Sequence, residues 1–187
     1  MKSKLLTKIT AAIFSLAVIY LGFIMLGLIP MILFAFGFLG GLILWLIFPA
    51  TLEFKSVRIP YFLTLGLFIV HKVEEKYMDF FPRLSEITNV PVPEVNSFTV
   101  YLLYAFAGAW LFIPYLVKKK YEFGYYLTWT FFTSMGVTEL AHFIFPFFTN
   151  ESYGYFPGMW SVIFLAPVAW WGLYRLLSFN KNYKLSK

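Results

Sequence analysis

The sequence has no cysteine and little charge. Only 13% of its 187 residues are Asp, Glu, Lys or Arg. The missing cysteine excludes disulfides, thiolate nucleophiles and cysteine-ligated metal sites. Soluble domains are about one quarter charged, so this chain lacks the polar surface that a water-soluble globule needs. Because 60% of its residues are hydrophobic, we expect lipid to be its main solvent.

The apolar residues form stretches of the length that an α-helix needs to cross a bilayer, about 20 residues. They predict an all-α fold, a polytopic transmembrane helical bundle that makes a single transmembrane domain over residues 1–187. Pro30 separates the first two stretches and predicts a tight reversal there. The six predicted spans are approximately 9–29, 31–52, 59–80, 98–117, 123–148 and 158–179.

Six crossings would place most basic residues on one side of the membrane. Lysines precede the first span, and basic residues follow the second, fourth and sixth spans. The other side of the membrane holds Arg83, and Lys72 and Lys76 lie near the outer end of the third span. This positive-inside pattern predicts that both termini are cytoplasmic. The net charge of +6 then faces anionic membrane lipid, so no nucleic-acid partner is expected. The N-terminal apolar run is longer than that of a usual signal peptide.

Two short polar motifs interrupt the apolar spans. The third span contains HKVEE at residues 71–75, and the fifth contains ELAH at residues 139–142, and together they hold both histidines of the chain. At 3.6 residues per turn, the ionisable residues of each motif share a helix face, His71 with Glu74 and Glu75 in the first. Both motifs lie roughly 18–24 Å from the inner end of their spans, in the outer half of the bilayer. They are therefore predicted to meet between facing helices.

Buried carboxylates point to a metal. Each costs at least about a few kcal/mol in a membrane, so a cluster needs protons, a lysine partner or a bound cation. Glu-x-x-His spacing presents ligands in di-iron bundles, and two histidines with carboxylates also suit zinc. We therefore expect a divalent metal, Zn or Fe. The candidate ligands are His71, Glu74, Glu75, Glu139 and His142.

A metal in the membrane suggests an enzyme that acts on a lipid or isoprenoid-like substrate. Glu74 and Glu75 are the candidate catalytic residues, since the one that does not bind metal could serve as general base. Tyr155 and Glu151, beyond the fifth span, are candidates for binding a substrate headgroup. Hydrolytic and di-iron oxidative reactions both stay open, because carboxylate-rich sites also suit iron.

The motif at residues 71–75 resembles that of the HXXEE-motif family of bacterial integral membrane proteins, which takes its name from this pattern. YFPG at residues 155–158 is similar to the family's Tyr-x-Pro-Gly turn before the last helix. The resemblance covers about residues 60–175, although FPR at residues 81–83 stands where the family usually has a further Pro-Gly turn. It implies a bacterial inner membrane protein and no particular reaction.

Other functions fit parts of the sequence. Intramembrane Glu and His are typical of proton relays, so a small transporter or proton-coupled carrier is an alternative, although no internal repeat is visible. A membrane assembly or scaffold protein, with buried charges that pair with a partner, is another. CAAX-type prenyl proteases carry Glu-Glu-x-x-x-Arg, but the arginine position is Asp79 here. The sequence predicts no oligomeric state.

Overall fold

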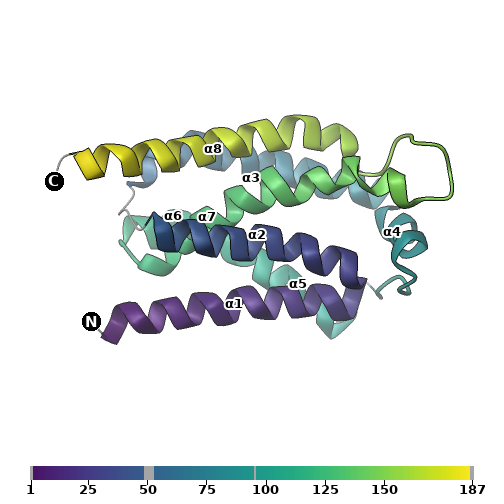
Figure 1. The fold of residues 1–187 in the computed structure, drawn as a ribbon, viewed down its shortest axis with the longest axis horizontal. Coiled ribbons are helices and arrows are strands. Elements are labelled where there is room, and N and C mark those ends of the chain that lie inside the picture. The colour runs from purple at the N-terminus through teal and green to yellow at the C-terminus, as the bar shows by residue number, and fades with distance from the viewer. Residues whose placement is uncertain (1, 49–52, 95, 186–187) are drawn as a thin grey trace.

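The computed structural model describes residues 2–48, 53–94 and 96–185, and all regular elements within them are helices (Figure 1). The predicted all-α fold is confirmed. The end of the second predicted span, residues 49–52, lies outside the described residues. In chain order the elements are α1 (Lys2–Leu26), α2 (Leu28–Ile47), α3 (Phe54–Tyr77), α4 (Phe80–Thr88), α5 (Phe98–Gly108), η1 (Ala109–Phe112), α6 (Ile113–Lys118), α7 (Glu122–Val137), η2 (Thr138–Phe143), η3 (Phe145–Phe148) and α8 (Met159–Leu185), where η denotes a 3₁₀-helix.

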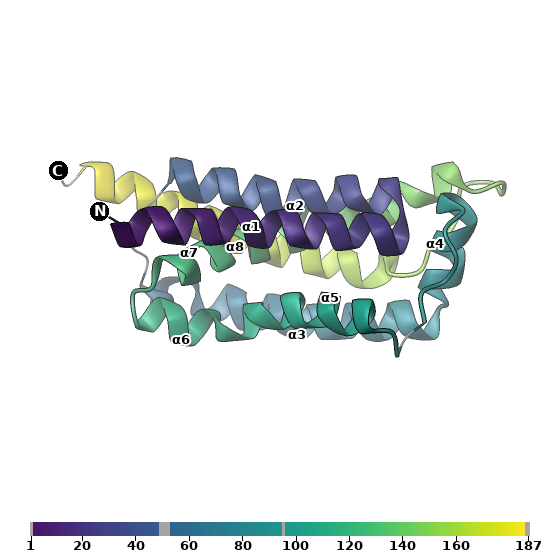
Figure 2. The same cartoon turned by 90° about the horizontal axis from the view of Figure 1, so that it is seen from below.

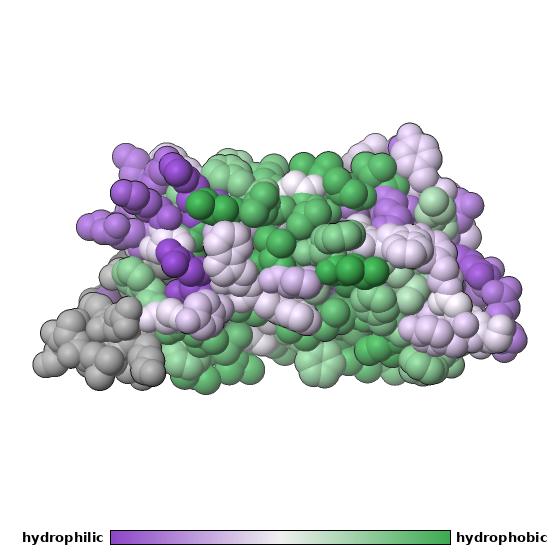
Figure 3. Space-filling model, turned by 90° about the horizontal axis from the view of Figure 1, so that it is seen from above, coloured by the Kyte–Doolittle hydropathy of each residue, from purple (hydrophilic) through white to green (hydrophobic). Residues whose placement is uncertain are grey.

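The bundle has the surface of a membrane protein. Five segments are helices long and apolar enough to cross a bilayer: Lys4–Leu26, Leu28–Ile47, Phe54–Tyr77, Phe98–Lys118 and Met159–Phe179. Figure 3 shows a broad apolar band between two hydrophilic ends. Large apolar side chains lie exposed in this band, which is costly in water and favourable in lipid.

Both ends of the chain path lie at one end of the bundle. α1 begins and α8 ends there, whereas α4 lies across the opposite end (Figures 1 and 2). This arrangement is consistent with an even number of crossings. The count of six and the cytoplasmic location of the termini stay predictions.

The first two helices separate at Gly27 and not at Pro30, where the sequence predicted the reversal. Gly27 has φ +92°, a conformation that residues with a side chain rarely adopt. Pro30 lies inside the first turn of α2, where its missing N–H costs no helix hydrogen bond. Gly27 therefore makes the break, and Pro30 is accommodated within the first turn of the next helix.

α7 is the central helix of the bundle. Its residues from Gly124 to Gly136 are all buried, and it packs against α2, α6 and α8. α2 comes close because Gly41 has no side chain: a Cβ there would collide with the backbone of Thr130. This central position fixes the depth and direction of the residues that follow α7.

The fifth predicted span is not one continuous α-helix. The α-helix ends at Val137, and the chain continues through η2 and η3. Trp170 Nε1 donates a hydrogen bond of 2.6 Å to the Gly136 carbonyl, which would otherwise accept from the helix four residues on. Pro146 then lies in η3, beyond this break. A 3₁₀-helix has three residues per turn, so the two ionisable residues of the ELAH motif point the same way.

Candidate metal centre

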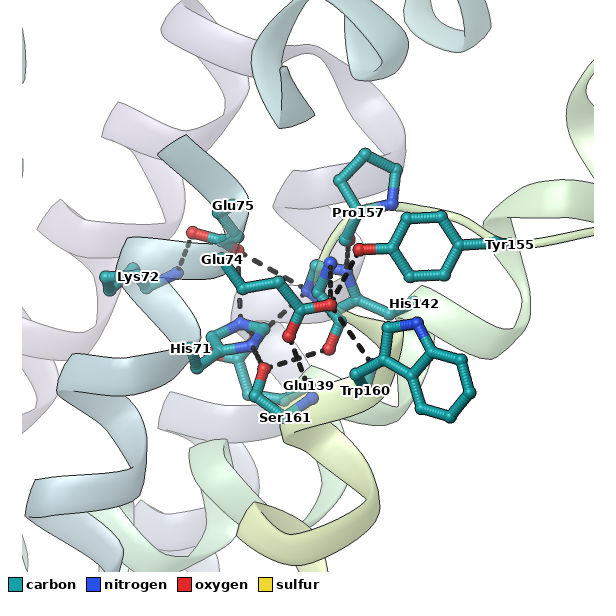
Figure 4. Close-up of polar contacts among 11 residues, drawn as sticks. His71, Lys72, Glu74, Glu75, Glu139, His142, Tyr155, Pro157, Trp160 and Ser161 are labelled. Carbon is teal, nitrogen blue, oxygen red and sulfur yellow. Dashed lines mark hydrogen bonds and ion pairs between the residues drawn. The ribbon is translucent and has the colours of Figure 1, made fainter. Parts of the chain in front are cut away.

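Four ionisable side chains from two elements, α3 and η2, converge at one site (Figure 4). His71 and Glu75 lie one turn apart on α3, and Glu139 and His142 lie one turn apart on η2. Each offers one ligand atom, and the four atoms lie within 4.8 Å of one another. The two motifs therefore meet as predicted, and the group could hold a metal ion.

Four of the separations between these atoms have the size expected in a small four-coordinate metal site. His71 Nε2 lies 3.1 Å from Glu75 Oε1 and 3.2 Å from Glu139 Oε2. His142 Nε2 lies 3.4 Å from each of these two oxygens. Ligand atoms about 2.0–2.1 Å from a tetrahedral Zn²⁺ lie about 3.3–3.4 Å from one another. The donor set, two nitrogens and two oxygens, also suits zinc.

Hydrogen bonds on the far side of each imidazole decide which nitrogen faces the centre. His142 Nδ1 contacts the Pro157 carbonyl oxygen at 2.5 Å, and a carbonyl only accepts, so Nδ1 carries the proton. His71 Nδ1 lies 2.8 Å from Ser161 Oγ, whose own hydroxyl donates to the Gly158 carbonyl. His71 Nδ1 therefore also donates. The Nε2 atom of each ring therefore faces the carboxylates.

This arrangement needs positive charge at its middle. Two imidazole nitrogens and two carboxylate oxygens lie together, on side chains that are only 0–12% exposed. Lys72 balances one carboxylate from the edge of the cluster, and a divalent metal or protons on the imidazoles would supply positive charge at its middle. The geometry thus fits a divalent metal or a pair of protons.

Lys72 forms an ion pair with Glu75 on the side away from the histidines. Its ammonium lies 2.7 Å from Glu75 Oε2, the oxygen turned away from the histidines. The Lys72 side chain is 42% exposed, so the pair lies at the edge of the cluster. Such an outer partner orients a ligating carboxylate. It leaves the other oxygen, Oε1, available to coordinate a metal.

Glu74, a predicted ligand, does not join the four. Its carboxylate accepts hydrogen bonds from the backbone N–H groups of Gly158, Trp160 and Ser161 at 3.2, 3.1 and 2.8 Å. The Tyr155 hydroxyl donates to it at 2.7 Å. These N–H groups belong to Gly158, just before α8, and to the first turn of α8, where no helical acceptors exist for them. Glu74 is therefore the N-terminal cap of α8, supplied by another helix.

Tyr155 and Glu151, the residues predicted to bind a substrate headgroup, also have protein partners. Burial and the Glu74 carboxylate raise the pKa of the Tyr155 phenol to about 12, so it stays protonated and donates at neutral pH. Glu151 is exposed and accepts from Arg83 at 2.9 Å, and this guanidinium lowers the pKa of the Glu151 carboxyl. In this structure, Tyr155 donates a hydrogen bond to Glu74, and Glu151 belongs to a surface ion pair with Arg83.

The turn before α8 supplies functional residues that the sequence reasoning missed. Pro157 and Ser161 orient the two imidazoles, and Gly158 lies between them with φ +98°. A Cβ on Gly158 would collide with both histidine rings. The Pro-Gly pair was visible as a turn before a helix, but nothing local indicated that the histidines lie against it.

Phenylalanine rings surround the centre near α4. Their centroids lie 5.1 Å (Phe80), 5.6 Å (Phe145) and 6.4 Å (Phe156) from that of His142. All three are buried. The surroundings of the cluster on this side are therefore apolar, which strengthens the interaction of its charges with each other.

No family model matches the chain, and no curated protein or solved structure does so either. The resemblance to the HXXEE-motif family remains a prediction from the motifs.

Proposed function

We propose that this protein is a membrane-embedded, metal-dependent enzyme that holds one zinc-type ion among His71, Glu75, Glu139 and His142. The observation that carries the proposal is the set of four separations of 3.1–3.4 Å, with both imidazole Nε2 atoms turned inward. Buried packing histidines need no such convergence with two carboxylates. The proposal extends to a bacterial inner membrane, which the resemblance implies.

A single ion fits better than a di-iron pair. A dinuclear centre needs several carboxylates that bridge through both oxygens. Glu74 is engaged at the α8 N-terminus, and Glu75 Oε2 is engaged by Lys72. A hydrolytic reaction is therefore favoured over a di-iron oxidative one.

The exposure of the four side chains suggests which would bind the ion and which would act as general base. A divalent ion supplies Lewis acidity to a hydrolytic reaction. His71, His142 and Glu75 are the most buried and have outer partners, so they would hold the ion. The Glu139 side chain is the most exposed of the four at 12%, and its carboxylate would accept the proton of the attacking water.

The surroundings favour an apolar substrate. The centre lies among buried phenylalanines, in a bundle whose flanks are apolar. A lipid or isoprenoid-like molecule would enter such surroundings from the bilayer without first crossing water.

Metal analysis of purified protein tests the proposal. After expression in metal-supplemented medium, the wild type should contain about one zinc per chain by mass spectrometry. Glu75→Gln and His142→Ala should contain far less, whereas the surface variant Glu86→Gln should match the wild type. A metal-free wild type would contradict the proposal.

A proton-coupled carrier is the second candidate, because two protons balance the cluster as well as one dication does. It predicts a metal-free protein that moves a solute across proteoliposome membranes with a pH dependence. That flux would be lost in Glu139→Gln. Metal content and flux together separate the two functions.

A further inference from the structure

Glu74 is bonded to the same short segment that orients both histidines. Its carboxylate oxygens accept hydrogen bonds from the backbone N–H groups of Gly158, Trp160 and Ser161. The segment from Pro157 to Ser161 also provides the acceptors for both imidazole Nδ1 atoms. One carboxylate therefore fixes the segment on which both histidines depend.

The link to His142 passes through a single peptide group. The Pro157–Gly158 peptide donates its N–H to Glu74 and presents its C=O to His142 Nδ1. Because a peptide group is planar, anchoring the N–H also aims the carbonyl. Glu74 thereby sets the direction from which His142 is held.

The link to His71 passes through a single residue. Ser161 donates its N–H to Glu74 Oε2 at 2.8 Å, and its Oγ lies 2.8 Å from His71 Nδ1. The hydroxyl proton of Ser161 goes to the Gly158 carbonyl, which leaves Oγ free to accept. The backbone of Ser161 is thus fixed by the carboxylate, and its side chain fixes the imidazole.

We infer that Glu74 is a positioning residue of the metal centre: it anchors residues 157–161 so that both histidines keep Nδ1–H outward and Nε2 toward the ion. The inference rests on the proposed function, since it concerns the same centre. A simple helix cap would only stabilise the fold. A positioning residue must also change how the centre binds metal.

Titration of the full-length, detergent-solubilised apoprotein with Co²⁺ tests this role. Co²⁺ reports affinity and, through its visible absorption bands, coordination geometry. Loss of outer partners lowers metal affinity about 10–100-fold, so Glu74→Ala should weaken Co²⁺ binding by that factor and alter the bands. Glu74→Gln keeps an acceptor oxygen and should fall between Glu74→Ala and the wild type. Glu86→Gln, an exposed carboxylate on α4, is the matched control.

The outcomes separate the two proposals. If the wild type binds no Co²⁺ or Zn²⁺, the proposed function fails and this inference fails with it. If folded Glu74→Ala binds Co²⁺ with wild-type affinity and bands, only the inference is overturned, and Glu74 is a helix cap. If Glu74→Ala does not fold, Glu74→Gln decides: weaker binding supports the role, and unchanged binding overturns it.

Discussion

Glu74 and Glu75 are neighbours in the sequence, but they serve two different regions of the molecule. Glu75 belongs to the ligand group, where it faces two imidazoles and is held from behind by Lys72. Glu74 belongs to the cap region, where it receives four hydrogen-bond donors from the turn and first residues of α8. One step along an α-helix rotates a side chain by about 100°, which is enough to separate the two roles.

A carboxylate at the end of α3 is thus stabilised in one of two ways. In the cap region, donors already saturate Glu74 and no cation is needed. In the ligand group, the Nε2 atoms of the two imidazoles face Glu75 and Glu139, so charge balance must come from a metal ion or from protons on these nitrogens. The second region is therefore the one expected to bind metal.

Gly158 is the position where both regions meet, and its substitution should have the largest effect. Gly158→Ala introduces a side chain at φ +98° that collides with both histidine rings. We expect loss of bound metal and destabilisation by more than about 1 kcal/mol. Metal content and thermal unfolding in detergent would measure both. Gly154→Ala, in the same loop but without a steric conflict, is the control and should behave as the wild type.

Lys72 tests the ligand group by itself. Lys72→Met removes the partner of Glu75 Oε2 and keeps the length of the side chain. The ligand remains but is less well oriented, so zinc affinity should fall about 10-fold or more. Competition with a chelator measures this change. Lys76→Met, an exposed lysine one turn further along α3, should leave affinity unchanged, and an equal effect of the two variants would contradict the role of Lys72.

Tyr155 tests the cap region by itself. Tyr155→Phe removes one of the four donors to Glu74, and the three backbone N–H groups remain. We expect a small loss of thermal stability and only a few-fold weaker metal binding. Tyr153→Phe, which loses a hydrogen bond to the Phe143 carbonyl, provides a matched loop control. A larger loss of metal in Tyr153→Phe would show that the loop acts by another route.

Arg83 should have the smallest effect, because it serves neither region. It links the exposed Glu86 and Glu151 at the surface, and such pairs contribute little in water. Arg83→Gln should retain the full metal content with a nearly unchanged melting temperature. Loss of metal here would mean that the loop before α8 depends on this ion pair and not on Glu74.

Most of the helices were predictable because the apolar stretches repeat at the length of a bilayer. The meeting of the two motifs was also predictable, since equal depth and a shared face leave few other arrangements. The break at Gly27 was assigned to Pro30, because both residues are typical of helix ends. Which one ends α1 depends on the backbone conformation that the packed hairpin requires.

The division between Glu74 and Glu75 was not predictable. Both lie within one turn of His71 and on a broad common face of α3, so spacing alone assigned both as ligands. The decision came from α8, whose first N–H groups need an acceptor where Glu74 lies. The change to a 3₁₀-helix at η2 likewise depends on another helix, because Trp170 of α8 donates a hydrogen bond to the Gly136 carbonyl.

By itself, the sequence determined the all-helical character of the chain and the types of residue available as ligands, because hydrophobicity and donor chemistry are properties of single residues. The tertiary structure decided which carboxylate caps a helix, which imidazole nitrogen faces the centre, and how the ligand atoms are spaced. These depend on hydrogen-bond partners far away in the chain. The end of α3 acquires its chemistry only when the turn before α8 is placed against it.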